Sequence, residues 1–173
     1  VAYWINFASV LASAFTIMFL FWSIVLFGKK LLKIEKLEAI NNENTWLLMG
    51  AGLVGSLAYT FSDTFWFSAV EAEVYAMSSF FTAWVVWAML KWDVIDDESK
   101  ANRWLILIFY MMGLSIGVHV LNLVTIPALS LIYYFKKYQP SLWGIVATLM
   151  ISLVIIFFIN SIVIPGLPSF AGS

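Results

Sequence analysis

The class of this protein follows from residues 5–27, INFASVLASAFTIMFLFWSIVLF, which contain no charged side chain. A helix of about 20 apolar residues is long enough to cross the hydrocarbon core of a bilayer. Lys29 and Lys30 follow this stretch directly. Because basic side chains resist translocation and collect on the cytoplasmic side, this order predicts a transmembrane helix that runs from outside to inside.

The composition of the whole chain supports the same class. Of the 173 residues, 63% are hydrophobic and 11% are charged, whereas about a quarter of the residues in a soluble domain are charged. This composition excludes a water-soluble domain. The net charge is −1, so the basic loops are explained by membrane orientation and no nucleic-acid partner is expected. The chain has no cysteine, which excludes a disulfide framework or a thiolate metal site.

The basic residues also predict the topology of the remaining spans. All nine Lys and Arg residues fall in residues 29–36, 91–103 and 136–137, and apolar segments separate these stretches. If all three stretches are cytoplasmic, the chain is an all-α integral membrane protein. We predict a single helical bundle over residues 1–173, with about six transmembrane helices and short loops. The expected spans are residues 5–27, 46–61, 74–92, 104–118, 121–135 and 142–164.

Glycines and polar connectors refine this map. Gly50, Gly52 and Gly55 give the second span a smooth face that another helix can approach closely, so we expect this span to be buried in the bundle. The GxxxG spacing of Gly113 and Gly117 likewise indicates packing residues. The pattern of residues 28–44 is equally compatible with a short amphipathic helix at the cytoplasmic surface and with a plain connector.

Two local motifs predict where helices begin and bend. Ser68 and Glu71 match a capping box, so a helix is expected to start there and to run inward through Trp92. Residues 104–118 and 121–135 each form only about 22 Å of helix, against a hydrocarbon core of about 30 Å. We therefore predict a turn below the outer membrane surface between these spans, around His119 and Asn122. Pro127 is expected to kink the second of the two spans.

A small set of polar residues on the predicted outer side forms the candidate site. The predicted apolar cores contain no charged group, which disfavours an ion-coupled transporter and favours an enzyme or a binding protein. The outer side itself contains no Lys or Arg. The candidate substrate-binding residues are Asp63, Glu71, Glu73, Tyr75, His119 and Asn122.

Each of the main candidates also has a structural alternative. Glu71 fits a capping role, Asp63 fits a turn role, and a buried His119 can simply bond a backbone carbonyl. If residues 119–122 are helical, His119 and Asn122 lie side by side and can bind an anionic head group. Metal ligation is disfavoured because no close ligand spacing such as His-x-x-x-His is present. We therefore expect neither a metal nor another cofactor.

Two longer segments carry a family resemblance. FWFSAVEAEVYAMSSFF, residues 65–81, and GLSIGVHVLNLVTIPAL, residues 113–129, resemble signature segments of a bacterial family of polytopic membrane proteins, long described as a domain of unknown function. That family is grouped with the GT-C-type membrane glycosyltransferases and is similar to an animal protein O-mannosyltransferase. GLPSFAG, residues 166–172, also fits it.

The resemblance implies a membrane enzyme that transfers a sugar, expected to be mannose, from a polyprenyl-phosphate donor. The implied acceptor is a Ser or Thr of an exported protein, and the implied location is the periplasmic face of a bacterial inner membrane. Membrane lipid is a further expected partner. Tyr75, His119 and Asn122 are the candidates for contacting the leaving phosphate, which needs positive or hydrogen-bonding partners.

One feature of the chain departs from the GT-C pattern. Such enzymes generally place the catalytic carboxylate in a long outer loop between their first two spans, and residues 5–27 already run inward, like the family's second span. The resemblance therefore implies that the catalytic base lies before Val1, that the chain is an internal fragment and that it is inactive alone. The alternatives are a transporter or flippase of lipid-linked substrates and a non-catalytic membrane scaffold.

Overall fold

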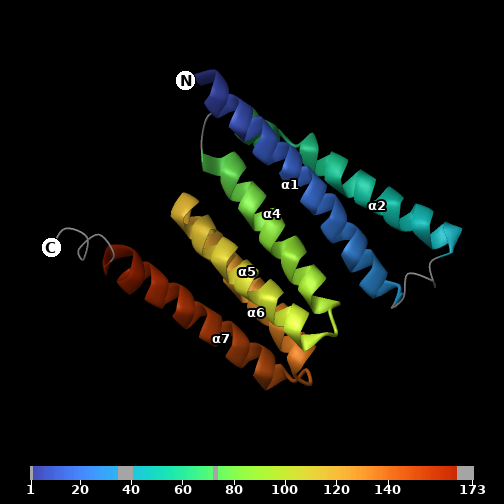
Figure 1. Ribbon diagram of the computed structural model, residues 1–173, viewed down its shortest axis with the longest axis vertical. Helices are drawn as coiled ribbons and strands as arrows, with labels where there is room; N and C mark the ends of the chain where they lie inside the picture. Colours follow the sequence, from blue (N-terminus) through green and yellow to red (C-terminus); the bar gives the residue numbers. More distant parts are fainter. Residues whose placement is uncertain (1, 35–40, 72–73, 167–173) are drawn as a thin grey trace. The chain divides into compact units, whose positions relative to one another are not determined.

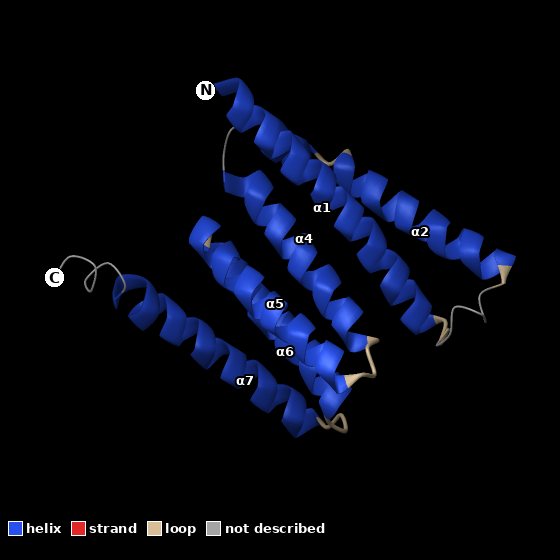
Figure 2. Cartoon of the chain, in the orientation of Figure 1, coloured by secondary structure: helices blue, strands red, loops and turns tan. Residues whose placement is uncertain are grey.

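The computed structural model describes residues 2–34, 41–71 and 74–166. Within these ranges the chain is all-α, with helices and no strand (Figure 2), so the predicted fold class is confirmed. The described residues include four helices that are long and apolar enough to cross a membrane: Tyr3–Leu31, Val74–Asp93, Glu98–Val118 and Leu142–Gly166. The chain is an integral membrane protein. Residues 46–61 and 121–135 are not among these four, and the count of six spans stays a prediction.

The chain divides into two compact units, Val1–His119 and Val120–Ser173, and each is described by itself. The prediction of one bundle over residues 1–173 therefore stays a prediction. The described elements of the first unit are α1 (Ala2–Leu31), α2 (Asn42–Thr60), α3 (Asp63–Val70), α4 (Val74–Asp93) and α5 (Glu98–Val118). Those of the second unit are the 3₁₀-helix η2 (Val120–Thr125), α6 (Ile126–Lys137), α7 (Leu142–Phe158) and the π-helix η3 (Ile159–Val163).

In the first unit, α1 packs against α2 and α4, and α4 packs against α5 (Figure 1). Aromatic rings connect three of these helices. The ring of Phe19 on α1 lies 5.0 Å from that of Trp87 on α4, and Trp87 lies 6.0 Å from Trp104 on α5. Aromatic pairs at such separations add to the gain from burial alone. This row of rings helps to hold α1, α4 and α5 together.

The glycines of α2 explain its close contact with α1. A Cβ atom at Gly52 would lie 2.8 Å from a ring carbon of Phe21, and one at Gly55 would lie 2.6 Å from the Cδ1 of Ile24. The predicted smooth face is thus confirmed at these two positions. The buried residues of α2 are confined to Leu48, Gly52 and Ser56. The expectation that this span is buried in the bundle is therefore wrong, because α1 covers only one side of it.

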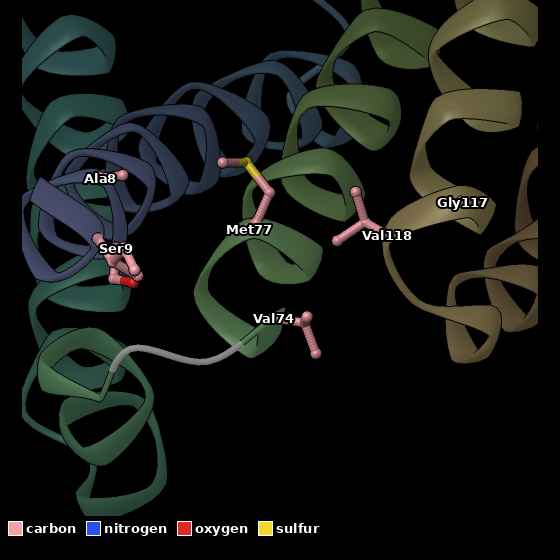
Figure 3. A pocket seen from close by; sticks show the side chains of 7 residues that line it. Ala8, Ser9, Val74, Met77, Gly117 and Val118 are labelled. Atoms are coloured by element: carbon pink, nitrogen blue, oxygen red, sulfur yellow. The ribbon is translucent and has the colours of Figure 1, made fainter. Parts of the chain in front are cut away.

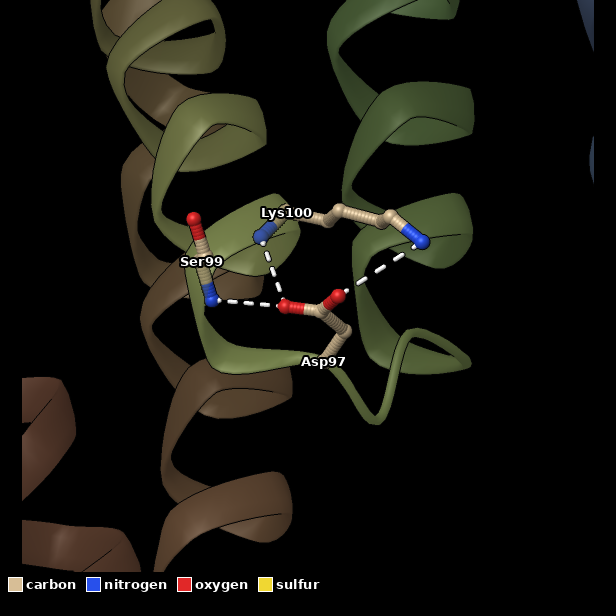
Figure 4. A network of polar contacts seen from close by, with 3 residues as sticks. All are labelled: Asp97, Ser99 and Lys100. Atoms are coloured by element: carbon tan, nitrogen blue, oxygen red, sulfur yellow. Dashed lines mark hydrogen bonds and ion pairs between the residues drawn. The ribbon is translucent and has the colours of Figure 1, made fainter.

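The start of α5 differs from the sequence-based prediction. The carboxylate of Asp97 accepts hydrogen bonds from the backbone N–H groups of Ser99 and Lys100, at 2.9 and 3.2 Å, and pairs with the Lys100 ammonium at 3.5 Å (Figure 4). This N-cap satisfies amides that a helix start otherwise leaves unbonded. As a result α5 begins at Glu98 and is about 31 Å long at the helical rise. The predicted short span at residues 104–118 is therefore wrong.

The aromatic segment before α4 is a helix of its own. Ser68 belongs to α3, where its hydroxyl donates to the Thr64 carbonyl at 3.0 Å. Glu71 caps the C-terminus of α3, and its backbone N–H donates to the Phe67 carbonyl at 3.1 Å. The predicted capping box is therefore wrong. Burial of the Phe65 ring, 4.6 Å from that of Tyr59, favours a separate helix here.

The predicted turn at His119 is present, in an altered form. α5 ends at Val118, and His119 has an extended backbone with φ −152° and ψ 123°. The helical spacing expected for His119 and Asn122 therefore does not occur. Pro127 lies in the first turn of α6, where a helix needs no N–H donor, so it starts that helix and does not kink it. The depth of this turn in the membrane stays a prediction.

In the second unit, α6 packs against α7 and one tyrosine closes their connection. The hydroxyl of Tyr134 accepts from the Ser141 N–H at 3.1 Å and donates to the Gln139 carbonyl at 3.0 Å. Two predictions fall partly outside the described residues. These are the amphipathic segment at residues 28–44, of which 35–40 are not described, and the motif at residues 166–172, of which only Gly166 is described.

Candidate functional site

Two of the six predicted site residues come together at one end of the first unit. Tyr75 lies in the first turn of α4, and His119 directly follows α5. Their ring centroids are 5.5 Å apart, with an angle of 41° between the ring planes. Because α4 and α5 run in opposite directions, the start of one lies beside the end of the other. Tyr75 is 48% exposed, so this ring pair is accessible.

An open pocket lies at the same end of the first unit as the ring pair. It has a volume of about 600 Å³, within the range of roughly 300–1,000 Å³ found for small-molecule sites. Val74 and Val118, which line it, are the sequence neighbours of Tyr75 and His119. Tyr75 and His119 themselves are not among the lining residues. The lining residues come from α1, α4 and α5 (Figure 3): Ile5, Ala8, Ser9, Val74, Met77, Gly117 and Val118.

The chemistry of the pocket is almost wholly apolar. Ser9, which is only 6% exposed, is the one side chain of the lining that can form strong hydrogen bonds. Met77 is flexible and polarizable, so it can adapt to an irregular apolar ligand. Val74 and Val118 are β-branched and stiff at χ1. Such a pocket is suited to an apolar ligand such as a hydrocarbon chain.

The other predicted site residues do not join this pair by any described contact. Asp63 is exposed in the first turn of α3, where the helix dipole favours a negative charge. Glu71 is exposed at the other end of α3. In the described ranges, no hydrogen bond or ion pair links either carboxylate to Tyr75 or His119. A shared site of these four residues stays a prediction.

The remaining two candidates are separate cases. Glu73 lies outside the described residues. Asn122 belongs to the second unit and is buried within η2, where its backbone carbonyl accepts a hydrogen bond from the Thr125 hydroxyl at 2.7 Å. Among the residues that the structure describes, no group of three or more His, Cys, Asp or Glu could hold a metal ion.

Sequence reasoning missed most of the pocket lining. Gly117 was expected to pack against another helix, yet a Cβ atom placed there would meet no atom within 4 Å. This glycine borders the pocket, so its predicted packing role is wrong within the described chain. The sequence did contain one indication of the polar residue in the lining, Ser9. The spacing of Ser9, Ser13 and Thr16 places their hydroxyl groups on one face of an otherwise apolar helix.

The fold and the pocket together define a polytopic, all-helical membrane protein with an apolar pocket at one end of its spans. A family model described as the protein O-mannosyl-transferase TMEM260 N-terminal domain matches residues 1–142. The chain belongs to this family. None of the curated proteins and none of the solved structures matches it. The match includes both signature segments, residues 65–81 and 113–129, and confirms the predicted link to protein O-mannosyltransferases.

Proposed function

We propose that the chain is the donor-binding part of a membrane glycosyltransferase that transfers mannose from a polyprenyl-phosphate carrier to Ser or Thr of exported proteins. The observation that carries this proposal is the apolar pocket of about 600 Å³ at the end of the first unit where the Tyr75 and His119 rings also lie. Membership of the O-mannosyltransferase family supports the reaction type. The identities of the sugar donor and of the acceptor, and the membrane face on which transfer occurs, are part of this proposal.

The pocket would hold the part of the isoprenoid chain that is nearest to the phosphate. Its lining of Val74, Met77 and Val118 offers apolar contact without a charge. The phosphate would then lie at the ring pair, where the Tyr75 hydroxyl and an imidazole N–H of His119 can donate hydrogen bonds to its oxygens. Hydrogen bonds to a charged oxygen are roughly twice as strong as neutral ones.

The residues of this chain would act mainly on the leaving group. In the reaction, the acceptor hydroxyl oxygen bonds to the anomeric carbon of mannose while the bond from that carbon to the phosphate oxygen breaks. The phosphate leaves with the electron pair, and a general base takes the hydroxyl proton. Donors at Tyr75 and His119 would stabilise the charge that develops on the phosphate.

The charge pattern supports an outer location for the site. Lys29 and Lys30 lie in the last turn of α1, and Lys91 lies in the last turn of α4. The pocket is lined from the opposite ends of these two helices, at Ile5 and Val74. With basic residues inside, the pocket faces the exported acceptor, and in a bacterium this face is periplasmic.

The proposal is tested by His119→Ala and Tyr75→Phe in the whole protein, with transfer of mannose from polyprenyl-phosphate mannose as the measurement. Loss of one donor to a developing oxyanion commonly lowers turnover by about a hundredfold or more. Tyr110→Phe is the matched control, because Tyr110 is an exposed residue on α5 that does not line the pocket. Full transfer by both site variants, at unchanged protein level, contradicts the proposal.

A further inference from the structure

We propose that α3 is an interfacial helix, which lies on the membrane surface at the pocket end of the first unit. Its Trp66, Phe67 and Val70 side chains would lie in the headgroup layer of the bilayer. The inference goes beyond the proposed function, because it assigns a partner, the lipid surface, to a helix that does not line the pocket. It involves neither the lipid carrier nor the sugar.

The two sides of α3 differ from those of a short helix on a water-soluble protein, where the outward side is polar. The side that faces the protein includes Phe65, which is buried with its ring 4.6 Å from that of Tyr59. The outward side carries Trp66, Phe67 and Val70, and each of these is more than half exposed. Single exposed apolar residues are normal, but a contiguous apolar face on one short helix indicates an interaction surface.

The direction of this apolar face is determined within the first unit. The helix α3 packs against α1, α2 and α4, and all three belong to the same unit as α3. The contacts that bury Phe65 therefore do not involve the second unit. Because Phe65 fixes which side of α3 faces the protein, it also fixes the side on which Trp66 and Phe67 point away.

The lengths of the neighbouring helices place α3 at the boundary of the bilayer. The 30 residues of α1 form about 45 Å of helix, against a hydrocarbon core of about 30 Å. With Lys29 and Lys30 at one boundary, the other boundary crosses α1 roughly ten residues from its start. Ile5, in this part of α1, lines the pocket together with Val74. Since α3 ends at Val70 and the span α4 begins at Val74, α3 lies at headgroup level.

The composition of this end of the unit indicates that lipid covers the face. Tryptophan and tyrosine are enriched where a membrane meets water. Tyr3 and Trp4, at the start of α1, are exposed like Trp66, and their ring centroids are 5.5 Å apart. The carboxylates of Asp63 and Glu71 lie at the two ends of α3, where water and headgroups can solvate them. The helix has no Lys or Arg, so an anionic lipid is not required.

The test uses nitroxide spin labels on the whole protein in phosphatidylcholine vesicles. The chain has no cysteine, and any cysteine elsewhere in the protein is replaced by serine. A label on a cysteine at position 66, 67 or 70 should collide often with O₂, which concentrates in hydrocarbon, and rarely with a water-soluble Ni(II) complex. A label at Asp96, exposed between α4 and α5, is the aqueous control. A label at Ser68, on the less exposed side of α3, should meet neither reagent often.

Three results would overturn the interfacial role of α3. Access of Ni(II) to positions 66, 67 and 70 equal to that at Asp96 would show that water covers the face. Poor access of both reagents, as at Ser68, would show that a protein segment covers it. We also expect Trp66→Glu to raise Ni(II) access to a label at position 67, whereas Thr64→Glu, at another exposed position of α3, should not. Equal effects of the two variants are the third contrary result.

Failure of this inference can be separated from failure of the proposed function. The spin-label experiment measures neither mannose transfer nor binding of polyprenyl phosphate. If α3 proves to be covered by water or by protein while the wild-type protein transfers mannose, only the interfacial role of α3 is rejected. If the labels report a lipid environment and no mannose is transferred, only the proposed function is rejected.

Discussion

Lys30, in the last turn of α1, forms an ion pair with Asp93, the last residue of α4, although 63 positions separate them in the sequence. The two helices run in the same direction and line the pocket at their other ends, at Ile5 and Val74. The pair therefore fixes one end of the two helices whose opposite ends form the candidate site.

Removal of Lys30 should lower the stability of the protein. The Asp93 side chain is 9% exposed and that of Lys30 is 59% exposed, so water screens the pair in part and the loss should be about 1 kcal/mol. Thermal unfolding in detergent of Lys30→Ala, Asp93→Ala and the double variant measures the coupling. Lys29→Ala removes a charge from the same helix turn and is the control. An equal effect of Lys29→Ala and Lys30→Ala would show that the pair adds nothing.

A methyl group at Gly52 should separate α1 from α2. The Cβ atom would lie 2.8 Å from the Phe21 ring and 3.0 Å from a methyl group of Val25, and such overpacking costs about 1–3 kcal/mol. Gly50→Ala is the control, because a Cβ atom at Gly50 meets nothing within 4 Å. It should be neutral or stabilising by about 0.5–1 kcal/mol. If Gly52→Ala unfolds at the same temperature as Gly50→Ala, the close approach of the two helices is refuted.

Single cysteines should reveal which loops are cytoplasmic. The chain has no cysteine of its own, so it gives no background labelling. Cysteine at Lys33, Asp97 or Lys137 should be shielded from an impermeant thiol reagent in intact cells, because these positions lie in or beside the basic stretches. Cysteine at Ser62 should react. If a cysteine at position 97 is labelled and a cysteine at position 62 is not, the topology is reversed and the pocket lies on the cytoplasmic side.

The helical membrane class could be predicted because the free-energy cost of placing a charged side chain in hydrocarbon depends on the residue type and not on tertiary packing. Residues 74–92 therefore match α4, Val74–Asp93, to within one residue. The start of α5 was missed because the Asp97 cap, and not hydropathy, determines it. Glu98, Lys100 and Arg103 are all helical although they lie outside the apolar window.

The site could be predicted only in part, because its geometry depends on contacts between helices. The basic loops predict that Tyr75 and His119 lie on the outer side of the membrane, and this prediction placed both among the candidates. That their rings lie 5.5 Å apart depends on the lateral packing of α4 against α5. The pocket depends on space that the side chains of three helices leave unfilled, and no periodicity in the sequence of one helix encodes such a space.

The occupant of the pocket is the central claim, and crosslinking tests it most directly. A polyprenyl phosphate with a photoreactive group on its first isoprene units should be added to membranes that contain the whole protein, and the labelled residues identified by mass spectrometry. We predict labelling at residues 8–9, 74–77 and 117–118, competed by unlabelled polyprenyl phosphate and reduced in Gly117→Val. Labelling confined to other exposed apolar positions, such as Leu153 and Phe157 of α7, without competition would contradict the account.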